Sequence, residues 1–202
     1  MKPAEAVAGA LDETPDALFV SSLGTATSAL RLASDDGPHL YLGGAMGCGL
    51  AVSLGVAEAR RDRDVVAVVG DGDLLMGAGS LWSLSGLRPK NLVVLVLDDG
   101  RYSITGGQEL IASDALASVL SGLPAVALAQ ATSREEVAKA VRTTPRPGVV
   151  LARIDEPTWP GPSPFVDPAR VRNSFSSYAE CAGSGPAQSA AHPMSDIDIT
   201  RR

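Results

Sequence analysis

The chain has 202 residues, which is long enough to bury a sizeable core and favours a single domain. Apolar residues make up 45% of it and aromatic residues only 4%, so we expect a core of Val, Leu, Ala and Ile. The net charge of −6, without clustered Lys and Arg, argues against the basic surface of a nucleic-acid-binding protein and against binding to an anionic membrane.

The two cysteines indicate the compartment. Cys48 and Cys181 form no C-x-x-C pair, which argues against an iron–sulfur or structural zinc site. Isolated cysteines in an enzyme-like chain are expected to be reduced thiols, so we expect a cytoplasmic protein. No signal-peptide pattern opens the chain, and no apolar run reaches the ~18 residues of a membrane span.

Apolar runs alternate with helix-forming segments along the chain. Residues 1–16 are weakly helical and then turn-like. The predicted strands are 17–21, 39–42, 65–69, 92–97, 125–129 and 149–154. The predicted helices are 27–33, 46–61, 79–87, 114–120 and 134–143, separated by turns that include 70–73 and the polar loop 98–107. Ser133 and Glu136 match a capping box before the last of these helices, and we expect Trp82 on a buried helix face.

The strands read as continuous apolar runs, not as alternating ones. Alternation of such strands with helices predicts an α/β fold with a doubly wound, mainly parallel sheet and helices on both faces. We expect one domain over residues 1–180 and a flexible tail over 181–202, where small and polar residues leave little to bury. Ligands of such folds bind beyond the carboxyl ends of the strands.

Two of the apolar strands end in acidic residues and glycine. Asp71 follows the first strand, and Asp98 and Asp99 follow the second. In a parallel sheet these ends face the same way, so carboxylates can converge on a hard cation such as Mg²⁺. The amides near Gly70 and Gly72 can cradle phosphate oxygens. The alternative is that these residues belong to ordinary solvated turns, where Asp and Gly are common.

The order of these segments resembles the thiamine-diphosphate enzyme signature, a G-D-G followed by a pair of asparagines. Here G-D-G lies at 70–72, a P-K-N turn at 89–91 and the acidic pair at 98–99, and the resemblance spans about residues 17–155. Within the family, D-D-G-R-Y-S-I-T-G-G-Q at 98–108 and G-G-A-M-G at 43–47 most resemble the short β subunits, or C-terminal halves, of sulfopyruvate and phosphonopyruvate decarboxylases.

The resemblance implies a thiamine-diphosphate and Mg²⁺ site. The metal ligands would be the side chains of Asp71 and Asp99 and the backbone carbonyl of Arg101. The residues that would contact the cofactor are Ser22, Gly24, Thr25, Gly44, Met46, Gly70, Gly72, Asp73, Asp99 and Tyr102.

Met46 and Gly44 would act on the organic part of the cofactor. The family places a bulky apolar residue where Met46 stands, beneath the thiazolium ring, so that it holds the cofactor in a bent V shape. The carbonyl of Gly44 would receive the 4′-amino group. The alternative for Met46 is an ordinary core methionine.

The chain departs from the family at two positions. Asp99 replaces the usual asparagine, which adds a negative charge near a diphosphate and puts the metal preference in doubt. Cys48 stands where relatives often have histidine, either because the substrate pocket differs or because Cys48 is a small buried helix residue. His39 is expected to be a satisfied surface or edge residue, and His192 lies in the expected tail.

One catalytic group of the family is missing from the sequence. The glutamate that activates the pyrimidine lies on a separate pyrimidine-binding domain, for which this chain has no room. The resemblance therefore implies a partner subunit and an α₂β₂ assembly or a multiple. The first hypothesis is decarboxylation of a small anionic 2-oxo acid. The others are carboligation or lyase chemistry with the same cofactor, and a non-catalytic scaffold subunit.

Overall fold

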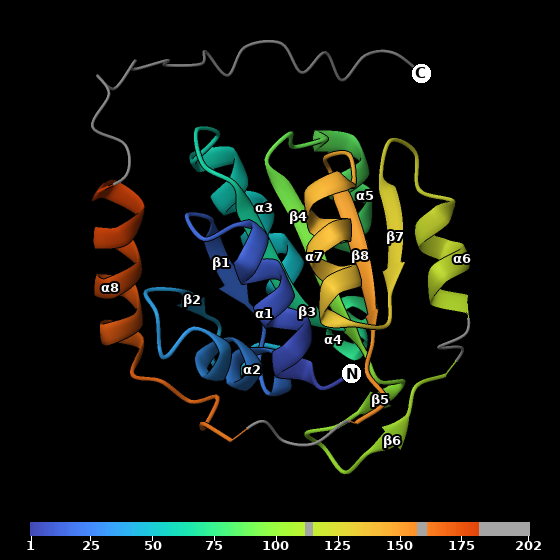
Figure 1. The fold of residues 1–202 in the computed structure, drawn as a ribbon, viewed down its shortest axis with the longest axis horizontal. Coiled ribbons are helices and arrows are strands. Elements are labelled where there is room, and N and C mark those ends of the chain that lie inside the picture. Colours follow the sequence, from blue (N-terminus) through green and yellow to red (C-terminus); the bar gives the residue numbers. More distant parts are fainter. Residues whose placement is uncertain (112–114, 157–160, 182–202) are drawn as a thin grey trace, which may run out of the picture.

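The computed structural model describes residues 1–111, 115–156 and 161–181. Its centre is a six-stranded sheet in the order β2-β1-β3-β4-β8-β7, in which all neighbouring strands are parallel (Figure 1). The strands are β1 (Leu18–Ser21), β2 (Leu40–Tyr41), β3 (Val65–Gly70), β4 (Leu92–Asp98), β7 (Ala127–Ala131) and β8 (Gly148–Arg153). The predicted doubly wound α/β fold is confirmed.

Helices cover both faces of this sheet (Figure 1). One face carries α1 (Pro3–Glu13), α2 (Thr25–Ala33) and α7 (Arg134–Thr143). The other carries α3 (Gly49–Ala59), α4 (Asp71–Met76), α5 (Gly79–Leu87) and α6 (Leu116–Ser121), and α8 (Pro168–Cys181) packs beside β2. No helix of the described part is both long and apolar enough to cross a membrane.

The continuous apolar character of the strands follows from this double coverage. In β3, Val66 and Val68 pack beneath α1, α2 and α7, whereas Val65, Ala67 and Val69 pack against the opposite helices. Because successive side chains point to opposite faces and both faces are buried, neither set can be polar.

Asn91 joins the end of α3 to the start of β4. Its buried side-chain amide donates hydrogen bonds to the carbonyls of Ala57, Arg60 and Arg63, at 3.1, 2.9 and 2.8 Å. These carbonyls lie at and beyond the end of the helix, where backbone acceptors lack helical partners. The asparagine of the P-K-N turn therefore acts as a cap for a neighbouring helix.

Several predicted boundaries shift in the structure. The segment expected to turn after β3 instead starts helix α4 at Asp71, where acidic residues favour a helix N-terminus. The expected loop after β4 contains a small antiparallel hairpin of β5 (Arg101–Tyr102) and β6 (Gln108–Glu109). The predicted cap of α7 is confirmed, since Ser133 Oγ accepts a hydrogen bond from the Glu136 amide.

The expectation for Trp82 was wrong, and that for His39 was wrong in part. Trp82 is 69% exposed, because Leu81 and Leu84 form the buried side of α5 and leave Trp82 on the outer side. His39 does precede the edge strand β2, but it is only 7% exposed, packs edge-on against Phe19, and has no hydrogen-bond partner for either ring nitrogen among the described residues. Of the expected tail only Cys181, the last residue of α8, is described, and residues 182–202 with His192 lie outside the described residues.

Candidate functional site

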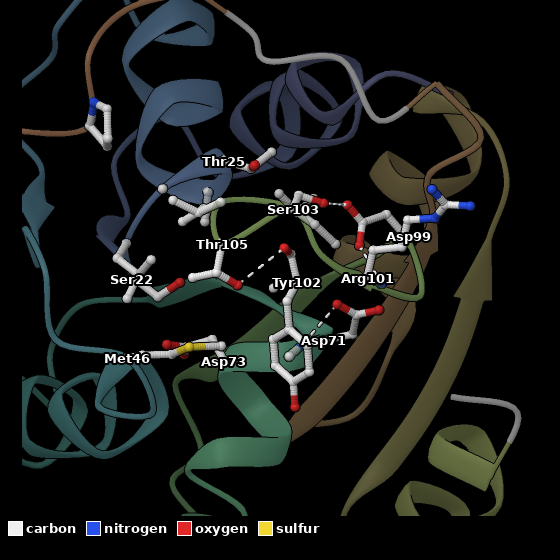
Figure 2. A pocket seen from close by; sticks show the side chains of 18 of the residues that line it. Ser22, Thr25, Met46, Asp71, Asp73, Asp99, Arg101, Tyr102, Ser103 and Thr105 are labelled. Atoms are coloured by element: carbon white, nitrogen blue, oxygen red, sulfur yellow. Dashed lines mark hydrogen bonds between the residues drawn. The ribbon is translucent and has the colours of Figure 1, made fainter. Parts of the chain in front are cut away.

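A cavity of about 310 Å³ opens beyond the carboxyl ends of the central strands. Figure 2 shows side chains from separate segments surrounding it, with Met46 and Asp73 at one side and Asp99 and Arg101 at the other. It brings together all the residues that the resemblance implicates. These are Ser22, Gly24, Thr25, Gly44, Met46, Gly70, Asp71, Gly72, Asp73, Asp99, Arg101 and Tyr102.

The position of the cavity follows from the strand order. From β1 the chain moves outward to β2 and then returns to the other side of β1 as β3. The connections that leave β1 and β3 therefore diverge and leave a crevice between them, which is the usual ligand site of open α/β sheets. Residues 22–26 and 70–73 form facing walls of this cavity.

Asp71 is the most deeply buried carboxylate of the cavity, at 2% exposed. Its Oδ2 accepts a 2.7 Å hydrogen bond from the amide of Gly100, and its Oδ1 accepts one from the amide of Gly72. Burial raises the pKa of the Asp71 carboxyl well above its ordinary value, and the negative charge of Asp99 adds to the rise. A cation at this point would stabilise the carboxylate.

Asp99 faces the same cavity from the end of β4. Its carboxylate accepts hydrogen bonds from the Arg101 amide, at 3.0 Å, and from the Ser103 hydroxyl, so it organises the turn that leads into β5. Each carboxylate oxygen has a further lone pair for a metal. Asp98, by contrast, is paired with Arg153 at 3.2 Å and does not line the cavity.

Ser22 is the clearest polar group without a partner. Its side chain is buried, at 1% exposed, and its Oγ has no hydrogen-bond partner within the described part of the chain. A buried hydroxyl without a partner costs free energy, so such a group in a cavity wall is suited to a polar ligand. The N-terminus of α2, at Thr25, lies beside it and favours negative charge.

The cavity glycines differ in what surrounds them. A Cβ at Gly44 or Gly70 would meet no atom within 4 Å, so their backbone is open to a ligand. A Cβ at Gly72 would lie 2.9 Å from the Tyr102 ring and 3.5 Å from Met46 Cε. Gly72 is therefore required because Tyr102 and Met46 pack over its backbone.

The side chain of Asp73 has a role that the sequence did not reveal. It is buried, and its Oδ1 accepts a 2.8 Å hydrogen bond from the amide of Gly47, which holds the segment that carries Met46. Burial raises the pKa of the Asp73 carboxyl, and the hydrogen bonds from the Gly47 and Gly49 amides oppose that rise.

The structure adds lining residues that sequence reasoning missed. Ile104 packs onto Gly24, where a Cβ would lie 1.7 Å from Ile104 Cδ1. Pro164 and Phe165 bring the segment before α8 to the cavity, a placement for which the sequence carries no local signal. Cys48 is exposed at the start of α3, so the alternative that it is a small buried helix residue was wrong, and it does not line the cavity of this chain.

The charges of the cavity fit a cation together with an anion. Its described lining contains three carboxylates and a single guanidinium, that of Arg101. A bare diphosphate would be repelled, whereas one bridged by a divalent cation would meet oxygen ligands, open glycine backbone and the free hydroxyl of Ser22. The residues present therefore fit Mg²⁺ and a diphosphate.

Comparison with known proteins finds curated relatives that are named phosphonopyruvate decarboxylase or sulfopyruvate decarboxylase. A phosphonopyruvate decarboxylase of Streptomyces viridochromogenes is 37% identical over 189 residues, which cover 88% of this chain and 46% of the relative. A sulfopyruvate decarboxylase subunit beta of Methanocaldococcus jannaschii is 33% identical over 92 residues, which cover 46% of this chain and 48% of the relative. The chain thus spans about half the length of these curated relatives.

Solved structures share the fold. A thiamine diphosphate-dependent 4-hydroxybenzoylformate decarboxylase of Rhodococcus jostii RHA1 superposes with a TM-score of 0.57 at 20% identity, over 80% of this chain and 33% of that one. The family profile described as thiamine pyrophosphate enzyme, C-terminal TPP binding domain, matches residues 24–150, which include both acid-ended strands and most of the cavity lining. The chain belongs to the family of C-terminal thiamine-pyrophosphate-binding domains of thiamine pyrophosphate enzymes.

Proposed function

We propose that this chain is the diphosphate-binding subunit of a two-subunit, thiamine-diphosphate-dependent 2-oxo acid decarboxylase, active only with a pyrimidine-binding partner. The observation that carries the proposal is the convergence of Asp71, Asp99 and the unpartnered Ser22 on one cavity of a thiamine-pyrophosphate-binding domain. The relatives named as decarboxylases supply the reaction class, and the small anionic substrates in their names supply the substrate class.

The metal would be held at the end formed by β3 and β4. Asp71 and Asp99 would each give a carboxylate oxygen to Mg²⁺, and Arg101 its backbone carbonyl. Mg²⁺ prefers such oxygen ligands and completes its octahedron with phosphate oxygens and water. The amides that already hold Asp71, those of Gly72 and Gly100, fix the direction of its carboxylate.

The diphosphate would lie between the metal and the N-terminus of α2. The amides near Gly72 and Asp73 would donate to it from one wall. Ser22 and Thr25 would hold its far end, where Ser22 gains the hydrogen-bond partner that it lacks within the described residues.

Met46 would support the bent cofactor from the side of Asp73, and the carbonyl of Gly44 would accept a hydrogen bond from the 4′-amino group of the pyrimidine. When bound, thiamine diphosphate supplies the carbon nucleophile and electron sink that decarboxylation of a 2-oxo acid needs. The protein's part is then to position the two rings, and the Asp73–Gly47 hydrogen bond fixes the segment from which Met46 projects.

A partner subunit would complete the site. No glutamate occurs among the described residues that line the cavity, and this chain spans about half the length of its curated relatives. The relatives named subunit beta favour a partner of a second type. We propose an assembly of the type α₂β₂ or a multiple of it. We also propose that it is cytoplasmic, because the two cysteines of this chain lack the pattern of a disulfide framework.

The test is calorimetric titration of thiamine diphosphate, with and without Mg²⁺, into the chain alone and into its complex with the subunit encoded by the neighbouring reading frame. Mg²⁺-dependent binding by the complex, followed by CO₂ release from sulfopyruvate or phosphonopyruvate, would support the proposal. Binding without CO₂ release but with formation of a carbon–carbon bond would favour a carboligase. Absence of binding in the complex would favour a scaffold subunit.

A further inference from the structure

A second, smaller cavity lies at the β2 edge of the sheet, between β2 and α8 (Figure 1). Its volume is about 40 Å³, and none of its described lining residues belongs to the cavity at the strand ends. The end of α2 with the turn after it, the start of β2, the segment before α8 and the first turns of α8 meet there. The lining residues are Arg31, Asp36, Gly37, His39, Tyr41, Val166, Arg170, Val171 and Ser174.

His39 is the group in this cavity whose polar atoms are unsatisfied. The side chain is 7% exposed, and neither ring nitrogen has a hydrogen-bond partner among the described residues. Phe19 and Tyr41 pack edge-on against the ring, and a Cβ at Gly37 would lie 2.8 Å from Nε2. A neutral imidazole has one donor and one acceptor, and burying them without partners costs free energy. His39 therefore favours a polar ligand in the cavity that it lines.

Positive charge exceeds negative charge in the cavity wall. Arg31 and Arg170 contribute two guanidinium groups, whereas Asp36 is the single carboxylate of the described lining. Arg31 donates to both oxygens of Asp36, at 2.5 and 3.2 Å, so these two charges largely cancel. Arg170 makes no ion pair within the described part of the chain. The wall as a whole is therefore suited to an anion.

The charge of Arg170 also reaches the interior of this cluster. The hydrogen bonds from Arg31, and after them the charge of Arg170, hold the pKa of the Asp36 carboxyl below its ordinary value. Asp36 thus stays ionised and keeps Arg31 in place, and Arg170 is left to act on a ligand. Burial lowers the pKa of His39 to about 4, so the imidazole is neutral and can donate one hydrogen bond.

The positions of these groups indicate the shape of the anion. Arg31 lies on α2, His39 precedes β2, and Arg170 and Ser174 lie on α8, so the cavity has polar groups on three sides. A carboxylate offers two oxygens in one plane, whereas a phosphate group offers oxygens in several directions, and guanidinium groups bind it well. One water-sized site needs roughly 10–15 Å³ of such volume, so the cavity has room for about three, enough for a group of that size.

We propose that the cavity between β2 and α8 is a binding site for a small tetrahedral oxyanion of the phosphate type. Arg31 and Arg170 would neutralise its charge, Ser174 would hydrogen-bond to it from α8, and the buried ring of His39 would gain a partner. The bound anion would join α8 to α2 and β2. The inference does not depend on the proposed function, because the two cavities share no described lining residue.

The test uses His39 as the reporter of its own site. The chain contains two histidines, so comparison with His39→Phe assigns the imidazole proton signals of His39 in an NMR spectrum. Inorganic phosphate is titrated into the full chain at pH 7, in exchange for chloride at constant ionic strength. Methylphosphonate is titrated in the same way, and stands for a phosphate-type group carried by an organic molecule.

Two variants of α8 form a matched pair. Arg170→Gln removes a guanidinium from the cavity wall, and Arg172→Gln removes one that contacts Asn173 and does not line the cavity. Both arginines are exposed, so neither change should disturb folding, and circular dichroism checks this.

We expect phosphate to shift the His39 signals to saturation and to raise the pKa of His39, because a bound anion stabilises the imidazolium. Arg170→Gln should weaken binding at least ~10-fold, as for loss of a hydrogen bond to a charged group, and Arg172→Gln should leave it unchanged. Phosphate should also raise the melting temperature of the unaltered chain and of Arg172→Gln more than that of Arg170→Gln.

Binding of methylphosphonate as well as phosphate would assign the site to a group carried by a larger molecule, and binding of phosphate alone would assign it to the free ion. Either result supports the site. The proposal is overturned if neither probe shifts the His39 signals to saturation, which would leave water as the occupant. It is also overturned if Arg170→Gln and Arg172→Gln respond alike, because the effect would then come from an adventitious ion only.

Discussion

The Asp73 carboxylate and the Gly47 amide are joined by a 2.8 Å hydrogen bond that connects two cavity segments far apart in the sequence. Asp73 follows Asp71 in the first turn of α4, and Gly47 follows Met46. The position of Met46 is therefore linked to the helix that starts with the proposed metal ligand. Asp73 therefore positions Met46, and we expect Asp71, not Asp73, to bind the cation.

Replacing Asp73 should disturb both stability and cofactor binding. Asp73→Ala leaves the partly buried Gly47 amide without its acceptor, which should lower the free energy of unfolding by about 1–3 kcal/mol. It should also weaken thiamine-diphosphate binding in the complex, because Met46 loses its fixed position. Asp73→Asn retains an acceptor oxygen and should restore most of both. Urea denaturation and calorimetry measure the two effects, and equal losses in both variants would contradict the positioning role.

Asp71→Asn should separate binding from stability. The neutral amide oxygen is a much weaker Mg²⁺ ligand than the Asp71 carboxylate, so Mg²⁺-dependent binding of thiamine diphosphate should be strongly weakened. The melting temperature of the free chain should change little, because relief from burying an ionised group offsets the loss of one of the two hydrogen bonds from the Gly72 and Gly100 amides. Retention of wild-type affinity, measured by calorimetry in the complex, would remove Asp71 from the metal site.

Asp99→Asn tests the departure from the family pattern. The variant removes one negative charge from a cavity that has three carboxylates. We expect a higher Mg²⁺ concentration for half-saturation, because an amide oxygen is a weaker ligand. At saturating Mg²⁺ the affinity for thiamine diphosphate should improve, because repulsion of the diphosphate falls. Two calorimetric series measure the affinity for Mg²⁺ and the affinity for thiamine diphosphate. A loss of both affinities, or a gain of both, would argue against this division of roles.

His39 should make stability depend on pH. Burial lowers the pKa of His39 from 6.5 to about 4, so the folded state holds it neutral, next to Arg31, Asp36, Tyr41 and Arg170. Below pH 6.5 the unfolded chain takes up a proton that the folded chain does not. The free energy of unfolding should therefore fall as the pH drops toward 4, by roughly 3 kcal/mol in all.

The control for this pH dependence is His39→Phe, which keeps the aromatic packing on Phe19 and removes the titrating group. Urea denaturation at pH 7, 6, 5 and 4 should show a smaller loss in the variant. Parallel curves for the two proteins would assign the acid sensitivity to other groups.

Asn91 should matter for stability alone. Asn91→Ala leaves the carbonyls of Ala57, Arg60 and Arg63 without their shared donor, which should lower the free energy of unfolding by about 1–3 kcal/mol. Its distance along β4 from the cavity predicts an unchanged affinity for thiamine diphosphate at a temperature where both proteins are folded. A loss of affinity with unchanged stability would reverse this assignment.

The central part of the fold was predictable because burial on both faces leaves a strong sequence pattern. The strands β3 and β4 and the helix α5 match the predicted ranges closely, since runs such as 92–97 admit only apolar residues. Local signals also sufficed for α7, whose cap Ser133 makes the expected hydrogen bond. Trp82 was misplaced because a helix without charged residues gives no polar side by which to orient it.

The site was predictable where chain order and resemblance agree, as for Asp71 and Asp99. The carboxyl ends of β3 and β4 had to meet, and the structure places both acids in one cavity. The contributions of Phe165 and Pro164 depend on how the segment before α8 returns across the molecule, which no local pattern encodes. The buried state of His39 likewise depends on tertiary packing by residues distant in sequence.

The segment from Asp99 to Ile104 is held at both of its ends. The Asp99 carboxylate accepts a hydrogen bond from the Ser103 hydroxyl, and Ile104 packs on the backbone of Gly24 at the opposite wall. A cation that shifted Asp99 would therefore also affect Ile104 and its contact with Gly24, at the N-terminus of α2. Because Ile104 contacts Gly24, a cation held by Asp99 and a diphosphate held at the N-terminus of α2 should each favour the binding of the other.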